Sequence, residues 1–65
     1  MNKIKGYRNM FNETQKDWAN LLGISVVSYG MKETKKVPFS DKEKEKIKAH
    51  IQEKIPNITI DDLFF

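Results

Sequence analysis

The side chains that most often perform catalysis are scarce in this chain and lack partners at useful spacing. The single histidine, His50, stands in a charged segment where spacing puts no carboxylate or cysteine beside it, so a surface or hydrogen-bonded histidine is expected rather than a base or ligand. The adjacent Asp61 and Asp62 would point in different directions on a helix and lack a further ligand group. The sequence therefore predicts no catalytic residues, no metal, no cofactor, no small-molecule substrate and no enzyme activity.

The remaining chemistry is binding by positive charge, which is concentrated in the first part of the chain. The 65 residues carry 12 Lys and Arg against nine Asp and Glu, a net charge of +3. Residues 1–39 hold seven basic and three acidic residues, whereas residues 40–65 hold five lysines and six acids. A polyanion would dock on the first part. Lysines that merely solvate a helical surface are the commoner explanation of such a pattern.

Two short helices joined by a tight turn are predicted over residues 14–33. Thr14 is a cap whose hydroxyl accepts from the backbone, and Asp17 suits the positive end of the same helix. Gly23 provides the left-handed residue that ends this helix, and Ser25 caps the next one. The apolar residues of the first helix that face one side are Trp18, Ala19, Leu21 and Leu22, and Ile24 points back to the core. This arrangement is that of a helix-turn-helix.

Three more helices complete the expected all-α, compact five-helix fold. The first covers roughly residues 2–11, ends at a left-handed Asn12, and has apolar residues at helical spacing, namely Ile4, Tyr7, Met10 and Phe11. Ser40 and Glu43 form a capping box for the fourth, which ends at Pro56-Asn57 and carries on one face Ile47, Ile51 and Ile55. A last turn or two begins at Thr59.

The length of the chain predicts one domain over residues 1–65, near the lower size at which a core suffices without disulfide or metal. The absence of cysteine is compatible with a reducing cytoplasm. The longest apolar run is too short to span a membrane, and the N-terminal segment lacks the apolar centre of a signal peptide. We therefore expect a cytoplasmic chain without a membrane partner.

The chain resembles the lambda-repressor-like helix-turn-helix family, which includes the Cro and CI phage repressors and the xenobiotic-response-element regulators. The similarity covers nearly the whole chain, including Pro38-Phe39-Ser40 and a tail, residues 58–65, like that of small Cro-like members. No single motif is decisive, but their joint order is specific. The residues that match the family pattern in order and spacing are Arg8, Thr14, Gln15, Ala19, Leu22, Gly23, Ile24, Ser25, Tyr29 and Glu33.

The resemblance implies a DNA-binding domain whose third helix enters the major groove of double-stranded DNA. Gln15 would donate to a phosphate, helped by free N–H groups at the helix start, although a glutamine that caps its own helix is the alternative. Arg8 and Glu33 would form a partly buried structural ion pair. The implied DNA-binding residues are Thr14, Gln15, Lys16, Ser25, Val26, Val27, Ser28, Met31, Lys32, Lys35 and Lys36.

Two features depart from the family pattern, namely the valines at the start of the third helix and Glu13. Val26 and Val27 stand where repressors commonly place glutamine, asparagine or arginine, so hydrogen-bonded readout is poor and apolar contact with thymine methyl groups or DNA shape would have to replace it. Gly30 weakens the third helix and leaves room for close approach of a phosphate or backbone. Glu13 replaces the usual apolar residue before the cap, and we expect it to turn aside from DNA.

Two classes of function follow from these residues. The first is a phage- or mobile-element-type transcriptional repressor that binds an operator as a weak homodimer, formed mainly on DNA. Phe65 would supply the dimer contact, while Leu63 and Phe64 are better explained as closing the core. The alternative is a protein-interaction module, such as an antitoxin or anti-repressor partner, that keeps the fold with reduced specific DNA binding.

Overall fold

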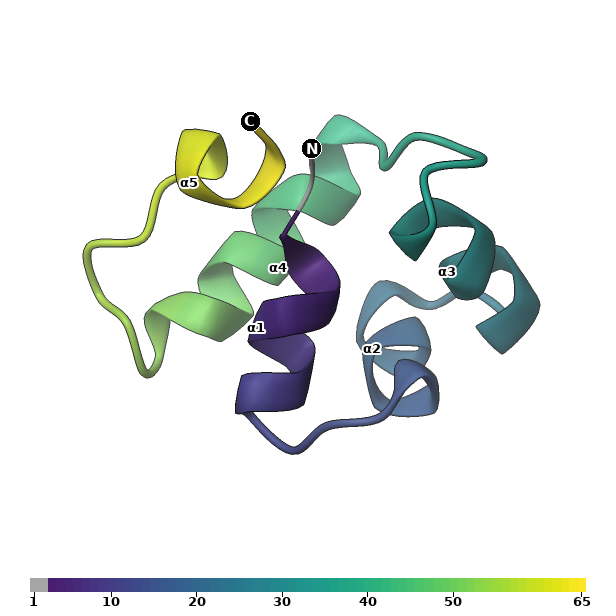
Figure 1. Ribbon diagram of the computed structural model, residues 1–65, viewed down its shortest axis with the longest axis horizontal. Coiled ribbons are helices and arrows are strands. Elements are labelled where there is room, and N and C mark those ends of the chain that lie inside the picture. Colours follow the sequence, from purple (N-terminus) through teal and green to yellow (C-terminus); the bar gives the residue numbers. More distant parts are fainter. Residues whose placement is uncertain (1–2) are drawn as a thin grey trace.

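Five helices make up the part of the chain that the computed structural model describes, residues 3–65, and no strand occurs among those residues (Figure 1). The all-α prediction is thus confirmed. No helix in this part is long and apolar enough to cross a membrane. The helices are α1 (Ile4–Met10), α2 (Gln15–Leu22), α3 (Val26–Glu33), α4 (Asp41–Gln52) and α5 (Ile60–Phe64).

The capping residues predicted from sequence set the starts of four helices. The side-chain oxygens of Thr14, Ser25, Ser40 and Thr59 each accept from a backbone N–H three residues on. Three of these caps are completed by an acid that accepts from the cap's own N–H, in α2, α4 and α5. Asn12 and Gly23 adopt the left-handed backbone that their positions required, with φ of 57° and 71°.

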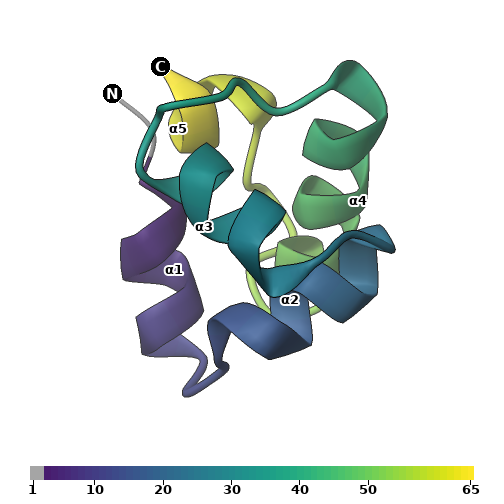
Figure 2. The ribbon, with the colours of Figure 1, turned by 90° about the vertical axis from the view of Figure 1, so that its right-hand side faces the viewer.

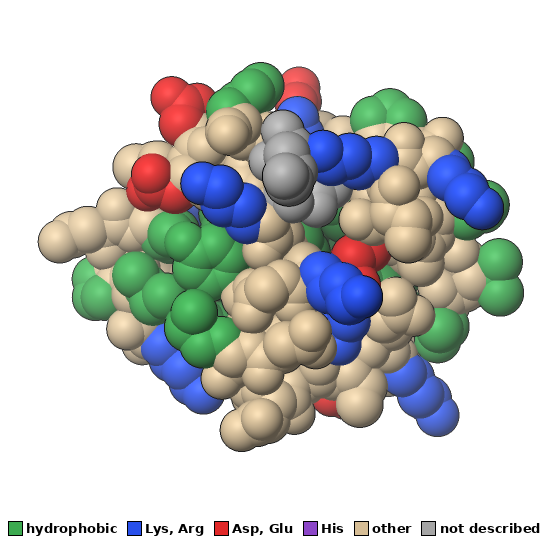
Figure 3. Space-filling view, viewed as in Figure 1, with side chains coloured by type: hydrophobic (Ala, Val, Ile, Leu, Met, Phe, Trp, Pro, Cys, Tyr) green, Lys and Arg blue, Asp and Glu red, His purple; other side chains and the backbone are tan. Residues whose placement is uncertain are grey.

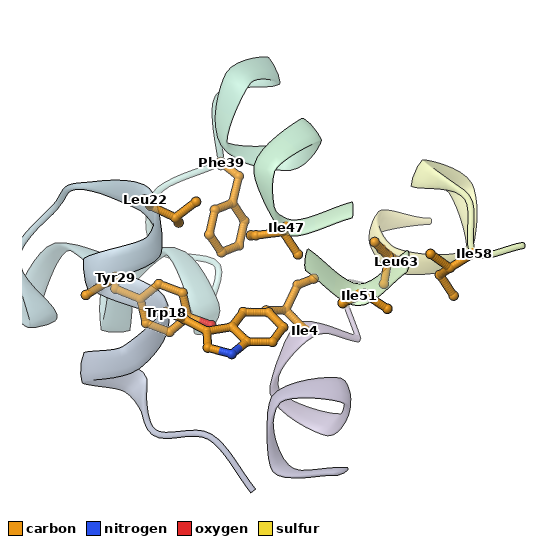
Figure 4. Packing of buried hydrophobic residues seen from close by; sticks show 10 residues of the cluster. Ile4, Trp18, Leu22, Tyr29, Phe39, Ile47, Ile51, Ile58 and Leu63 are labelled. Carbon is orange, nitrogen blue, oxygen red and sulfur yellow. The ribbon is translucent and has the colours of Figure 1, made fainter. Parts of the chain in front are cut away.

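A single apolar core joins all five helices (Figure 4). Trp18 of α2 and Tyr29 of α3 lie at one end of it, near Phe39 from the segment before α4. Toward α5 the core continues through Ile51, Ile58 and Leu63. The start of α1 is attached to α5, since the Lys3 backbone N–H donates to the Leu63 carbonyl at 2.9 Å. Figure 1 shows α4 behind α1, between α5 and the α2–α3 pair.

The inward face of α1 differs from the predicted one. Met10 is 63% exposed, while Arg8 is buried beside the core. Ile4 is six residues before Met10, which puts their side chains on different sides of a helix, whereas Arg8 is four residues after Ile4 and shares its face. The helix begins at Ile4; the predicted start at residue 2 lies outside the described residues.

Helix α4 is shorter than predicted. It ends at Gln52 rather than at Pro56-Asn57, so Ile55 lies in the following turn, half-buried against the core. A residue before proline avoids the helical conformation, which explains why the helix does not reach Ile55. The Gln52 amide donates to the Ile58 carbonyl at 3.4 Å and so helps to return the chain toward the core. The turn thereby buries Ile58.

Candidate nucleic-acid interface

Helices α2 and α3 form a closely connected pair at one side of the molecule. The backbone N–H of Ile24 donates to the Ala19 carbonyl at 3.0 Å, directly after the left-handed Gly23. Ala19 is fully buried, and its small side chain suits close approach of the two helices. Figure 2 shows α3 in front of the rest of the fold, with α2 beneath it. One face of α3 is therefore held by the core and the other is free.

The end of α3 is fixed by a buried carboxylate, Glu33, which accepts four hydrogen bonds. Arg8 of α1 donates through Nε and Nη2 at 2.9 and 3.0 Å, which gives the predicted ion pair a bidentate form. The Tyr29 hydroxyl donates at 2.7 Å and the Gln15 amide at 3.1 Å. Arg8 also donates through Nη1 to the Glu13 carbonyl at 2.9 Å. One carboxylate thus links α1, α2 and α3.

The electrostatics of this network favour a charged Glu33. Burial alone would raise the pKa of this carboxyl, but hydrogen bonds from Arg8, Tyr29 and Gln15 outweigh it and hold the pKa below its usual value. The hydrogen bond to Glu33 raises the pKa of Arg8. Burial, followed by the hydrogen bond to Glu33, raises the pKa of the Tyr29 hydroxyl. The ionised pair and the neutral phenol are therefore the stable forms.

The place of Gln15 corrects the alternative expectation that it caps its own helix, whereas its contact with a phosphate stays a prediction. Its amide neither caps its own helix nor points away from the protein, because its Nε2 donates to Glu33. Its Oε1 lies 3.7 Å from where a Cβ on Gly30 would stand. The open side of Gly30, expected to admit a phosphate or a backbone, thus faces Gln15. The spacing of residues does not predict this contact, because Gln15 and Glu33 are 18 residues apart in the sequence.

The outward face of α3 is mainly apolar. Val27 is the most exposed, at 74%, and Val26 and Met31 are also exposed. Ser28 is half-buried, and its backbone N–H donates to the capping Ser25 hydroxyl at 3.1 Å. Figure 3 shows hydrophobic and basic side chains together along the side of the molecule where α3 lies. This face offers methyl groups and one hydroxyl, and little hydrogen-bonding capacity.

Lysines stand at both ends of the α2–α3 pair. Lys16 is exposed in the first turn of α2. Lys35 and Lys36 are exposed directly after α3, where the N–H of Lys36 donates to the Met31 carbonyl at 2.8 Å and Lys35 has a left-handed φ of 70°. Lys32 differs, because both oxygens of Glu43 in α4 accept from its ammonium at 2.6 Å. Its charge is thus offset within the fold.

The capping hydroxyls of Thr14 and Ser25 each accept a hydrogen bond from the backbone of the helix that they begin. The Thr14 hydroxyl accepts from the Asp17 N–H at 3.1 Å, and Asp17 accepts from the Thr14 N–H at 2.9 Å. Both hydrogen bonds lower the pKa of Asp17, and the one from the Thr14 backbone has the larger effect. An exposed carboxylate therefore stands beside Lys16 at the start of α2.

Glu13 and His50 form a contact that spacing did not predict. The Glu13 Oε1 atom lies 2.7 Å from His50 Nε2, and Trp18 donates its indole N–H to the same oxygen at 2.9 Å. His50 also packs edge-on against the Trp18 ring, with ring centroids 5.5 Å apart. His50 therefore has a carboxylate partner, correcting the expectation that it lacked one. The fold brings this partner from 37 residues away, and the Glu13 carboxylate turns toward His50 and Trp18.

Within residues 3–65, no three His, Cys, Asp or Glu side chains gather in a way that would hold a metal ion. Comparisons of the chain with protein-family models, with curated proteins and with solved structures find no significant match.

Proposed function

We propose that this protein is a DNA-binding transcriptional regulator of the lambda-repressor-like type, in which α2 and α3 act as a helix-turn-helix. Helix α3 enters the major groove and presents Val26, Val27 and Ser28 to the base edges. Valine methyl groups pack on thymine methyl groups, and the rest of the selectivity comes from DNA shape. Binding near a promoter would then repress transcription by occlusion.

The distribution of charge around α3 supports this proposal most strongly. Residues 18–40 contain one carboxylate, Glu33, which is only 6% exposed and is paired with Arg8. The charged groups at the surface of this segment are therefore lysines, with Lys35 and Lys36 unpaired by any carboxylate in the described part of the chain. A polyanion can approach the outward face of α3 without meeting an exposed negative side chain from α3 itself.

The hydrogen bonds of Lys32 and Gln15 guide which side chains the proposal assigns to phosphates. Lys35, Lys36 and Lys16 serve as phosphate contacts, and Lys32 and Gln15 serve to hold α3 in place. The first turn of α2 contributes backbone N–H groups rather than the Gln15 amide. Asp17 and the caps Thr14 and Ser25 orient the helix ends.

The test is the salt dependence of binding to an AT-rich duplex and to a random duplex, measured by fluorescence anisotropy. The double variant Lys35→Asn, Lys36→Gln should flatten the slope of log K against log salt by about two units on both duplexes. Asparagine is chosen at position 35 because it tolerates the left-handed backbone. The matched control is Lys5→Gln, Lys46→Gln, which removes two exposed lysines from α1 and α4. Equal slopes for the two double variants would refute the proposed interface.

A second candidate is a protein-interaction module, favoured by the apolar character of the exposed α3 face. Val26→Ser with Val27→Ser separates the two functions. If the protein binds DNA sequence-specifically, this change alters the preference among duplexes by roughly 1 kcal/mol per thymine contact and does not change the slope of log K against log salt. Salt-insensitive weak binding to every duplex, in the unaltered protein, would instead support the interaction module.

A further inference from the structure

A surface pocket of about 300 Å³ lies between the end of α3, the segment that leads into α4, and α5. Its apolar lining comes from Val37, Pro38, Phe39 and Phe64, and its basic lining from Lys32, Lys35 and Lys44. This volume is at the lower end of the range for small-ligand sites. The pocket is separate from the outward valine face of α3 and has no part in the proposed base contacts.

The pocket combines an aromatic wall with a positive rim. Phe39 and Phe64 meet edge-to-face, with ring centroids 5.7 Å apart. The Lys44 ammonium stands 5.3 Å from the Phe64 ring centroid and 5.7 Å from that of Phe65, so cation–π attraction holds it beside the wall. A cation fixed over aromatic rings is well placed to receive an anion attached to an apolar group.

The charges that line the pocket do not cancel. Glu43 offsets Lys32, whereas Lys35 and Lys44 have no carboxylate within salt-bridge distance among the described residues. No Asp or Glu side chain lines the pocket. Two positive charges therefore remain at the rim of a mainly apolar surface, which suits a negative ligand and disfavours a positive one.

We propose that this pocket binds a small amphiphilic carboxylate, one that joins a carboxylate to an aryl or short alkyl group. The carboxylate interacts with Lys44 and Lys35, and the apolar group packs against Phe39, Phe64 and Pro38. Inorganic phosphate would use only the rim, and a cationic analogue only the wall. The three classes of ligand are therefore distinguishable by affinity.

The direct experiment is a protein-observed NMR titration without DNA, with 4-phenylbutyrate as the probe. We expect saturable shifts confined to the pocket residues, with a Kd of about 1 mM, as suits a ligand of this size. 4-Phenylbutylamine, which has the same apolar body, should bind at least about fivefold more weakly because it loses the attraction to the lysines. Inorganic phosphate should give no saturable shift at Phe39 or Phe64.

Two variants locate the charge that matters. Lys44→Met keeps most of the apolar stem and should weaken 4-phenylbutyrate about fivefold. Lys46→Met, at an exposed position on the same helix, is the matched control and should bind like the unaltered protein. Unchanged helical circular dichroism in both variants shows that folding is not the cause.

Several outcomes would overturn the proposal. These are the absence of saturable shifts with 4-phenylbutyrate, equal affinity for the amine, equal effects of Lys44→Met and Lys46→Met, or phosphate shifts that match those of the probe. None of these measurements uses DNA, so they test the ligand-binding proposal independently of the proposed DNA-binding function. Because Lys35 belongs to both surfaces, 4-phenylbutyrate should also weaken DNA binding if both proposals hold.

Discussion

At the scale of single residues, Glu33 joins three helices through the four side-chain hydrogen bonds that it accepts. Its carboxylate accepts from Arg8, Tyr29 and Gln15, so its removal leaves a buried guanidinium without its partner. The cost of breaking a buried ion pair from one side is several times larger than the net contribution of the pair itself, because the remaining charge stays desolvated. Glu33 thus matters for holding the fold together, whatever the function of α3.

We predict that Glu33→Gln lowers the free energy of unfolding by about 3 kcal/mol. Glutamine preserves the volume of the side chain, so the loss reports on the charge and the hydrogen bonds rather than on a cavity. Urea denaturation followed by circular dichroism measures it. Glu45→Gln, at an exposed position of α4, is the control and should change stability by less than about 0.5 kcal/mol. If both variants unfold at the same urea concentration, the network contributes no net stability.

A second prediction at this scale concerns pH and Glu13. The hydrogen bond from His50, followed by that from Trp18, holds the pKa of Glu13 below its usual value. A carboxyl with a lowered folded-state pKa stabilises the protein above its unfolded-state pKa and loses that contribution as pH falls through the folded-state pKa. The difference in unfolding free energy between the unaltered protein and Glu13→Gln should therefore be larger at pH 6 than at pH 3. A difference that stays constant over this range would contradict the prediction.

At the scale of elements, α3 combines a poor helix former with strong external support. Gly30 stands in the middle of the helix with a normal helical backbone, and its nearest neighbour on the Cβ side is the Gln15 amide oxygen at an ordinary contact distance of 3.7 Å. Glycine costs helix stability through the entropy of the unfolded chain. The Glu33 network, the Ser25 cap and the buried Tyr29 compensate for that cost.

We predict that Gly30→Ala stabilises the protein by about 0.5–1 kcal/mol. This raises Tm by about 4–8 °C per kcal/mol in a domain of this size. Gly6→Ala is the reference for helix propensity alone, because nothing lies within 4 Å of its Cβ position. Gly23→Ala should instead lower Tm, since position 23 requires a φ of 71°. A lower Tm for Gly30→Ala would mean that the contact with Gln15 is too tight for a methyl group.

At the scale of the whole molecule, one domain of this size would cover about half of a two-fold operator. The proposed function therefore implies a second copy. Leu63 is fully buried and Phe64 half-buried, as expected of residues that close the core, whereas Phe65 is 72% exposed. Phe65 is thus the aromatic residue of the C-terminal segment that is free to contact another chain.

We predict that removal of Phe65 lowers affinity for a full two-fold operator more than affinity for a half-site. Under the proposed function, Phe65 would supply apolar contact between the two copies, so its loss should cost cooperativity without preventing α3 from entering the groove. Gel-shift titrations on both duplexes measure the two affinities, and Met10→Ala, which removes another exposed apolar side chain, is the control. Equal loss on both duplexes would place the dimer contact elsewhere.

Local chemistry in the sequence was sufficient to determine the starts of α2, α3, α4 and α5, the stops at Asn12 and Gly23, and most of the core. Caps, left-handed turn residues and apolar spacing act over three or four residues, so they can be predicted from the sequence without a tertiary structure. The Arg8–Glu33 pair was also anticipated, but from the family resemblance rather than from spacing. The end of α4 was predicted too far along the chain, because the helix stops at Gln52, before Ile55, which precedes Pro56 and avoids the helical conformation.

Contacts between distant residues were decided only by the tertiary structure. The pairs Glu13–His50, Gln15–Glu33 and Lys32–Glu43 are separated by 37, 18 and 11 residues, and no periodic pattern links their members. In each pair, a polar side chain that the sequence left without an internal partner makes a hydrogen bond within the fold. Burial makes such partners necessary, since a polar group withdrawn from water must be hydrogen-bonded, and which partner it finds depends on how the helices pack. The sequence therefore determined the helices and the caps of α2 to α5, and helix packing decided which polar side chains are hydrogen-bonded within the protein.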